Sequence, residues 1–264
     1  MNLVFTSAGD NSNIEKWLSR GNKNFDLWIT YYGDRNDPYR ELADYYSVRK
    51  GGKYPNLHYA YRNWKHILDQ YEAIMVMDDD IIINASGISR LFEIRRQFGL
   101  WLLQPAFSPA GRISHPITAV HPLKMLRYTN FVEMNCPLFQ KNKLDDFMHI
   151  YDPALEVYGV DWWYLEKLGP VPAGKMAIID EVYCINPHTS TKKDGRRECL
   201  KSKQECSAVE TWRRIKVFHN IKTDEKGYLT FGSVNRISFH DLWVSALYFF
   251  SLLKSAIKLL SQTH

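Results

Sequence analysis

The 264-residue chain lacks the sequence signatures of several common protein classes. Its four cysteines form no CxxC pair and have no histidine at the spacing of a zinc site, so we expect reduced thiols. The first residues contain no basic region followed by a long apolar stretch, so no secretory signal is expected and a cytoplasmic location is the default prediction. No internal repeat, low-complexity tract or signature of RNA or DNA binding occurs.

The composition indicates one folded domain with a mild positive charge. Hydrophobic residues make up 45% of the chain and aromatic residues 14%, which is enough to bury one large core. The formal charge of +5 suits anionic partners such as nucleotide phosphates or acidic lipid headgroups. Because this charge is too small to argue for nucleic acid, no nucleic-acid partner is expected.

Three consecutive aspartates, Asp78, Asp79 and Asp80, are the most informative feature of the chain. Apolar runs at 74–77 and 81–83 flank them, and the first run predicts a central strand buried on both faces of a parallel α/β sheet. Adjacent carboxylates beside a core are costly unless a positive charge neutralises them, most simply a divalent cation. The alternative is a solvated loop, or a helix N-cap in which Asp80 accepts backbone N–H groups.

A coarse pass along the chain predicts alternating strands and helices. Strands at 3–7 and 25–32, a helix-like segment at 59–71 and the strand from 74 give a βαβαβ arrangement, with the acids at the carboxyl end of its third strand. Open α/β sheets bind ligands at that edge. Further elements are expected in the second half of the chain: strands at 100–104, 130–139 and 176–185, and a helix at 143–151.

Several short segments also match, in order, the motifs of a known family. The segment MDDDI at 77–81 takes the place of that family's Trp-Asp-Glu-Asp-Leu. The other matching segments are 103–106, 117–118, 131–134, 136–139, 157–161 and 177–180. Together they resemble a plant-enriched domain family, also found in bacteria and long of unknown function, whose members look like GT-A fold nucleotide-sugar glycosyltransferases. Where the family has a late histidine this chain has Asn186, and the nearest histidine is His188.

The resemblance implies a GT-A-like domain over 1–235 with a mixed, mostly parallel sheet flanked by helices. It implies a metal held by Asp80, by Asp78 as a second ligand or ribose contact, and by His188, with Asp79 near the nucleotide but pointing elsewhere. Imidazole ligation favours Mn²⁺ over Mg²⁺. His188 in Asn-Pro-His-Thr is otherwise an ordinary turn residue.

Asp161 is the candidate general base for transfer with inversion. It follows Gly159, which permits an unusual backbone turn, and it precedes Trp162, whose ring could stack on an acceptor sugar or be buried. Alternatively, Asp161 caps a helix that begins at Trp162, and a retaining enzyme would need no base. Glu133, within an apolar segment, is expected to bind acceptor hydroxyls or to pair with a buried arginine.

The ends of the first two strands are expected to hold the nucleotide. Thr6 and Ser7 can bond to base or ribose, while Tyr32 and Asp34 offer a stacking ring and a carboxylate. Lys53, in the segment KGGK, could place an ammonium near the diphosphate, or it could lie in a solvated turn.

Two basic segments remain. The lysines and arginines within about 189–207 predict a mobile lid over the diphosphate, or a plain solvated loop. Residues 242–260 contain only Lys254 and Lys258 as charges, within a predicted amphipathic helix over 236–264. This helix is expected to lie on an anionic membrane surface, or to dock on the core or on a dimer partner.

These features together predict a metal-dependent glycosyltransferase on the inner face of a membrane. Its donor would be a nucleotide sugar, with a UDP-sugar favoured, and its acceptor a saccharide or glycolipid. The alternatives are a metal-dependent nucleotidyltransferase and a non-catalytic module that binds sugar or membrane.

Overall fold

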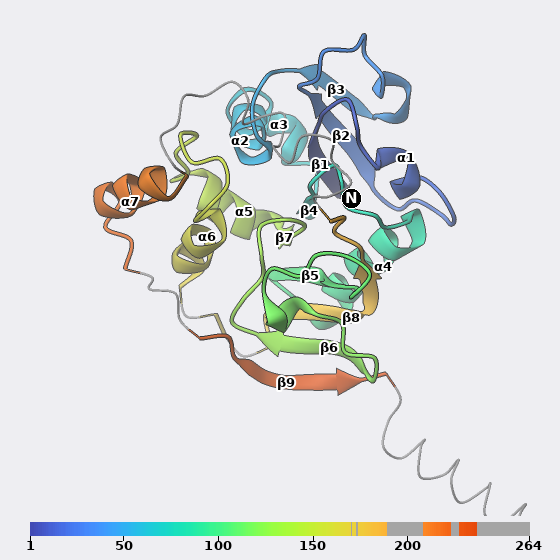
Figure 1. Cartoon of the computed structure of the whole chain (residues 1–264), viewed down its shortest axis with the longest axis vertical. Coiled ribbons are helices and arrows are strands. Elements are labelled where there is room, and N and C mark those ends of the chain that lie inside the picture. Colours follow the sequence, from blue (N-terminus) through green and yellow to red (C-terminus); the bar gives the residue numbers. More distant parts are fainter. Residues whose placement is uncertain (170, 173, 189–207, 223–226, 237–264) are drawn as a thin grey trace, which may run out of the picture.

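The structure, a computed structural model, describes residues 1–169, 171–172, 174–188, 208–222 and 227–236 (Figure 1). The predicted basic loop at about 189–207 and the predicted C-terminal helix lie outside these residues, apart from the single position 236. Among the helices that are described, none has the length and apolar character needed to cross a membrane.

A parallel sheet forms the N-terminal half of the fold. Four strands occur in the order β3-β2-β1-β4, all parallel, so their carboxyl ends meet at one edge. Their bounds are β1 (Asn2–Ala8), β2 (Asp26–Tyr31), β3 (Tyr45–Val48) and β4 (Ala73–Val76). All four residues of β4 are buried.

The second half of the chain extends this sheet with mixed pairing. Strand β7 is antiparallel to both β4 and β5, and β8 lies parallel to β5. The described strands form one nine-stranded sheet in the order β3-β2-β1-β4-β7-β5-β8-β6-β9. The bounds are β5 (Leu102–Phe107), β6 (Lys124–Thr129), β7 (Leu138–Gln140), β8 (Met176–Cys184) and β9 (Thr230–Asn235).

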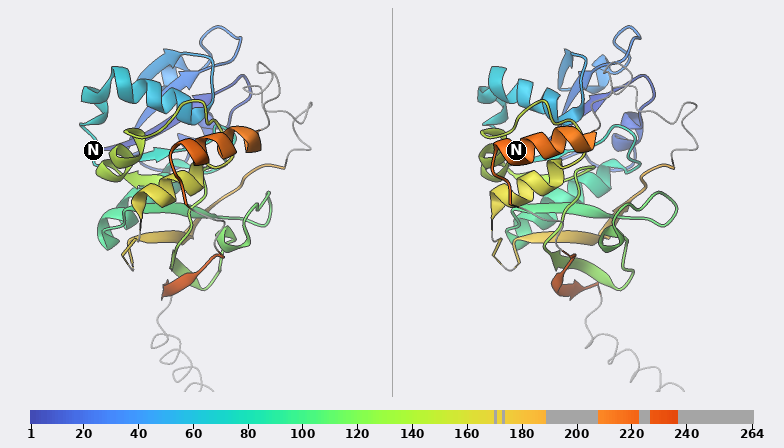
Figure 2. Two further views of the ribbon diagram at one scale, coloured as in Figure 1. Left: turned by 90° about the vertical axis from the view of Figure 1, so that its left-hand side faces the viewer. Right: turned by 60° about the vertical axis from the view of Figure 1, so that its left-hand side comes forward.

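Helices cover both faces of the sheet (Figures 1 and 2). Ile74 and Val76 of β4 pack into one core cluster together with side chains of α2, α5, α6 and α7, whereas Ala73 and Met75 pack into the other with α1 and α4. The α-helices are α1 (Ile14–Trp17), α2 (Lys53–Asn63), α3 (Lys65–Leu68), α4 (Ala85–Phe98), α5 (Lys141–Met148), α6 (Val160–Leu168) and α7 (Ala208–Phe218). The described residues also form two 3-10 helices, η1 (Arg40–Leu42) and η2 (Pro116–Thr118).

The α/β class and the central buried strand before the aspartates are confirmed. The predicted βαβαβ count was wrong, because β3 intervenes and the acids follow the fourth strand. The helix predicted at 59–71 begins earlier, at Lys53, and α2 is followed by the short α3. Helix α4 was not predicted, although Asn84 caps its start and Gly99 ends it in the left-handed conformation.

The strand predicted at 130–139 was also wrong, since only the residues of β7 pair in the sheet. Side chains take the place of a neighbouring strand before it. Tyr164 donates its hydroxyl to the Val132 carbonyl, and Lys53 donates to the carbonyls of Met134 and Asn135 at 2.6 and 2.9 Å. The segment therefore stays buried without regular pairing.

A buried ion pair joins β6 to β8. Arg127 donates to both oxygens of Asp180, at 2.8 and 3.0 Å, and to the carbonyls of Ile117 and Ala119. His121 adds its backbone N–H to the same carboxylate at 2.7 Å. Because the Asp180 side chain is wholly buried, these donors stabilise its negative charge in place of water.

We expect Arg127→Met to lower the free energy of unfolding by about 3 kcal/mol, because it leaves a buried carboxylate without its cation. Denaturant unfolding measures the loss. Lys124→Met, on the same strand, is the matched control and should change stability by no more than about 0.5 kcal/mol. Equal effects of the two substitutions would contradict the structural role of the pair.

Candidate functional site

The first aspartate of the triad is held by a buried lysine. The ammonium of Lys53 lies 2.9 Å from Oδ1 of Asp78, and the two side chains are 6% and 13% exposed. The backbone N–H of Asp78 donates to the Asn135 carbonyl at 2.8 Å. Lys53 is therefore not in a solvated turn: it begins α2 and joins that helix to the end of β4.

The other two aspartates are connected to the loop that follows β1. The backbone N–H of Gly9 donates to Oδ2 of Asp79 at 2.9 Å, and the backbone N–H of Asn13 donates to the Asp79 carbonyl at 2.7 Å. The side-chain amide of Asn13 also donates to the Asp80 carbonyl. These bonds fix the backbone of the triad, while the Asp79 carboxylate is already engaged by the main chain.

Glu133 lies in the same buried region. Its side chain is 2% exposed; Asn135 donates its amide to Oε1, and Oε2 has no partner among the described residues. Burial, followed by the negative charges of Asp161 and Asp78, raises the pKa of Glu133 to about 8. We therefore expect Glu133 to carry a proton near neutral pH. The predicted pairing with a buried arginine is absent among the described side chains.

Asp161 lies in the first turn of α6, which begins at Val160 after Gly159. The carboxylate is buried and accepts the backbone N–H of Trp162 at 3.0 Å. Asp161 is thus inside the helix and is not its N-cap, which corrects the capping alternative. Gly159 has φ 97° and packs under Trp212 of α7, so a side chain at this position would be strained and would collide with that ring.

Tyr54 is affected by two of the same carboxylates. Burial and then the charges of Asp78 and Asp161 raise the pKa of Tyr54 well above its usual value. Its hydroxyl donates to the Met134 carbonyl at 3.2 Å. The charges of Asp78 and Asp161 thus act on both Glu133 and Tyr54. Lys53 places a buried positive charge beside Asp78.

The strand ends predicted to hold the nucleotide lie at the same edge of the sheet. Thr6 and Ser7 are buried, and the Asn56 amide donates to the Ser7 hydroxyl at 2.9 Å. Tyr32 is half-buried. Asp34 is exposed and pairs with Lys50 at 2.5 Å, so its carboxylate stands at the rim of this region.

Trp162 belongs to an aromatic group beside the acids. Its ring lies 5.2 Å from Phe131 and is nearly parallel to Tyr228 at 6.5 Å. It is 8% exposed, so most of the ring is buried in this packing.

A short backbone bridge joins the segment that follows the triad to the residue after β8. Ile82 and Ile185 exchange both backbone hydrogen bonds, at 2.9 and 3.0 Å, in antiparallel orientation. His188 is exposed and lies three residues after Ile185, and Asp80 lies two residues before Ile82 on the paired segment. Within the described parts of the chain, no three His, Cys, Asp or Glu side chains gather closely enough to hold a metal ion. Joint ligation by Asp78, Asp80 and His188 therefore stays a prediction.

Sequence analysis missed the polar side chains that support the acids. Asn56 donates to Ser7 and to the Gly51 carbonyl at 3.0 Å, and the buried Gln104 accepts the Glu133 backbone N–H at 2.6 Å. The available signal was an amide residue, Asn56 or Gln104, at a position where the neighbouring pattern predicts burial. This signal indicates that a polar partner is needed, but the partner comes from a distant part of the chain.

Comparison with solved structures shows the GT-A-like fold. TarS of S. aureus is 14% identical with a TM-score of 0.51, and the match covers 85% of this chain and 40% of TarS. TarS 1-349 in complex with UDP-GlcNAc gives the same identity and TM-score over 85% of this chain and 68% of that one. GalNAc-T7 with UDP, GalNAc and Mn²⁺ is 8% identical with a TM-score of 0.55, over 84% of this chain and 49% of that one.

No family model and no curated protein sequence matches the chain. The solved structures therefore establish the glycosyltransferase-type fold, whereas the resemblance to the plant-enriched family stays a prediction. The chain spans less than half the length of the first TarS chain and of the GalNAc-T7 chain.

The raised pKa of Glu133 predicts a pH dependence of stability. The folded state keeps the proton up to about pH 8, whereas a glutamate carboxyl group in the unfolded chain loses it near its ordinary pKa of 4.5. Between these values folding takes up a proton, so stability falls as pH rises, by up to about 1.4 kcal/mol per pH unit, and levels off above the folded pKa.

Glu133→Gln removes this titration while keeping the size of the side chain. In EDTA, the stability of the variant relative to the original protein should rise from about pH 5 to pH 8 and then stay constant. Denaturant unfolding across this range measures the difference. A flat difference would show that Glu133 is ionised in the folded protein.

Proposed function

We propose that this protein is a metal-dependent glycosyltransferase that moves a sugar from a nucleotide-sugar donor to a saccharide acceptor. The observation that carries the proposal is the position of Asp78 and Asp80. In a GT-A-like fold they stand at the carboxyl end of β4, beside the ends of β1 and β2, with Glu133 and Asp161 in the adjoining buried region. Ligands bind at this edge of open α/β sheets.

A UDP-sugar is the proposed donor. Structures with this fold contain UDP-GlcNAc in TarS, and UDP with GalNAc and Mn²⁺ in GalNAc-T7. In this chain the ends of β1 and β2 supply Ser7, Tyr32 and, at the rim, Asp34 as candidate contacts to the nucleoside.

The residues present suit a hard divalent cation at the triad. Asp80 and Asp78 offer carboxylate oxygens, and Asp79 is held by Gly9. His188 follows Ile185, which pairs with Ile82 two residues after Asp80, and it is the proposed third ligand. A bound Mn²⁺ or Mg²⁺ would supply positive charge against the negative charge that develops on the departing diphosphate.

Asp161 is the proposed base. The acceptor oxygen forms a bond to the anomeric carbon, the bond from that carbon to the diphosphate oxygen breaks with its electron pair, and the hydroxyl proton passes to Asp161. The start of α6 favours a negative charge at this position. A protonated Glu133 lowers the repulsion around Asp161 and keeps one hydrogen to donate to an acceptor hydroxyl.

Attachment to the inner face of a membrane and a glycolipid acceptor are further parts of the proposal. They depend on the sequence of residues 236–264, all but the first of which lie outside the described structure. The reaction products separate the alternatives: a glycosyltransferase releases a nucleoside diphosphate, a nucleotidyltransferase releases pyrophosphate, and a binding module releases neither.

We expect UDP-sugars to raise the melting temperature of the protein in Mn²⁺ and not in EDTA, because a ligand that binds only the folded state stabilises it. Asp80→Ala should remove this metal-dependent shift. Asp146→Ala, an exposed aspartate on α5, is the matched control and should retain it. If no nucleotide sugar shifts the melting temperature in Mn²⁺ or in Mg²⁺, the proposed function is wrong.

Asp161→Asn should lower kcat by about a thousandfold, because the amide keeps the shape of the side chain but cannot accept the proton. The KM for the donor should stay nearly unchanged, since the base acts on the acceptor. Release of nucleoside diphosphate measures both constants, and Glu166→Gln on the same helix serves as control. Retention of most activity by Asp161→Asn would argue for a retaining mechanism without this base.

A further inference from the structure

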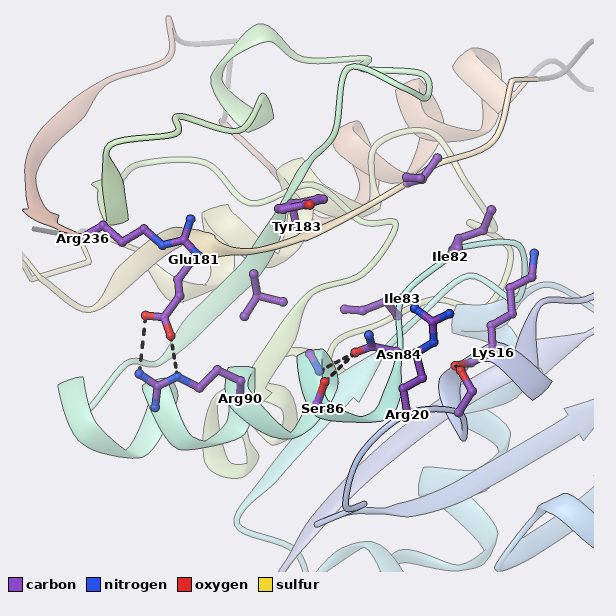
Figure 3. A pocket seen from close by; sticks show the side chains of 14 residues that line it. Lys16, Arg20, Ile82, Ile83, Asn84, Ser86, Arg90, Glu181, Tyr183 and Arg236 are labelled. Carbon is purple, nitrogen blue, oxygen red and sulfur yellow. Dashed lines mark hydrogen bonds and ion pairs between the residues drawn. The ribbon is translucent and has the colours of Figure 1, made fainter.

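A pocket of about 790 Å³ lies on the α1 and α4 side of the sheet (Figure 3). The loop after α1, the start of α4 and the end of β8 form its walls. Its volume is within the range of pockets that bind small molecules. Ile82, Asn84 and Ile185 line it, so it adjoins the segment that links the aspartate triad to α4.

The charge of the pocket is strongly positive. Lys16, Arg20, Arg90 and Arg236 line it, against a single acid, Glu181. Arg90 donates to both oxygens of Glu181, at 2.8 and 3.5 Å, and Figure 3 shows this pair on one wall. The remaining three cations have no carboxylate in the lining to neutralise them.

Arg20 and Arg236 are available to a ligand. Neither guanidinium forms an ion pair or hydrogen bond with the described residues, and both side chains are exposed. Their backbones are nevertheless fixed, because Ser86 donates its N–H to the Arg20 carbonyl at 3.3 Å and Arg236 donates its N–H to the Leu123 carbonyl at 3.1 Å.

The backbone at Arg20 supports a functional role for its side chain. Arg20 has φ 53°, in the left-handed region that is uncommon for residues with a side chain, and the next residue is Gly21. Such strain persists where the surrounding structure holds it, and it is concentrated at functional sites. Here it accompanies a guanidinium that lines the pocket.

The other walls suit a saccharide. The oxygen of the Asn84 side chain accepts from Ser86 and Gly87, at 2.9 and 2.8 Å, which leaves its amide nitrogen as a donor. Tyr183 is 57% exposed and lines the pocket, so its ring is open to stacking. Amide donors, an aromatic ring and guanidinium groups together match sugar hydroxyls, a sugar face and an attached anion.

We propose that this pocket binds the anionic part of the saccharide acceptor, a sugar that carries a phosphate or a carboxylate. The acceptor role rests on the proposed glycosyltransferase function. Asp80 and Asn84 are four residues apart, so at most about 14 Å of extended chain separates the triad from the pocket. An acceptor of a few sugar units can therefore occupy the pocket with one unit and reach the transfer site with another.

The test is isothermal titration of the full chain with glucose 1-phosphate, with glucuronate and with uncharged glucose, at low salt in EDTA and without nucleotide. Arg20→Gln and Arg236→Gln should each weaken binding of the anionic sugar by about tenfold. Arg62→Gln, an exposed arginine on α2, makes the same charge change away from the pocket and should bind as the original protein does. The melting temperatures of all variants check that they are folded.

Binding of glucose 1-phosphate but not glucuronate would identify phosphate as the recognised group, and the reverse would identify carboxylate. The proposal is overturned if neither anionic sugar binds, if glucose binds equally well, or if both pocket variants bind like Arg62→Gln. Because nucleotide and metal are absent, this failure is separate from failure of the proposed function. Anion binding by a protein that binds no nucleotide sugar would overturn the acceptor role alone.

Discussion

The site depends on the burial of one ammonium group. Lys53 places its charge among the Asp78 carboxylate and the carbonyls of Met134 and Asn135, so the start of α2, the end of β4 and the segment before β7 meet at one atom. An unpaired ammonium at this depth would be strongly unfavourable. The three segments are therefore fixed relative to one another by the requirement that this single charge be solvated by the protein.

The same ammonium does not balance the acids around it. Asp78, Asp161 and Glu133 lie in the same buried region as Lys53, and burial of several carboxylates in low dielectric is costly. The raised pKa of Glu133 lowers this cost, because we expect its carboxyl group to keep a proton near neutral pH. The negative charge that remains near the triad favours a cation at this edge of the sheet, which agrees with the proposed binding of a divalent metal ion and a diphosphate.

Local patterns predicted the central strand but not the segment that carries Glu133. Residues 73–76 are apolar without interruption because helices cover both faces of β4, and that pattern is visible in the sequence. Residues 131–137 are also buried, yet the side chains of Tyr164, Tyr54 and Lys53 donate to carbonyls of this segment. No periodicity within the segment reports on donors that come from α2 and α6, so it was predicted as a strand.

The candidate site could be located from the sequence, because acids at the end of a buried strand must face the ligand edge of the sheet. Its organisation could not, since the Ile82–Ile185 bridge joins positions more than a hundred residues apart. Ile82 and Ile185, the two residues of that bridge, follow the triad and precede His188 in the sequence. Both also line the basic pocket. In the proposed reaction, the diphosphate of the donor and the anionic group of the acceptor would bind at opposite ends of this short segment. The length of the segment would then set the distance between the two bound charges.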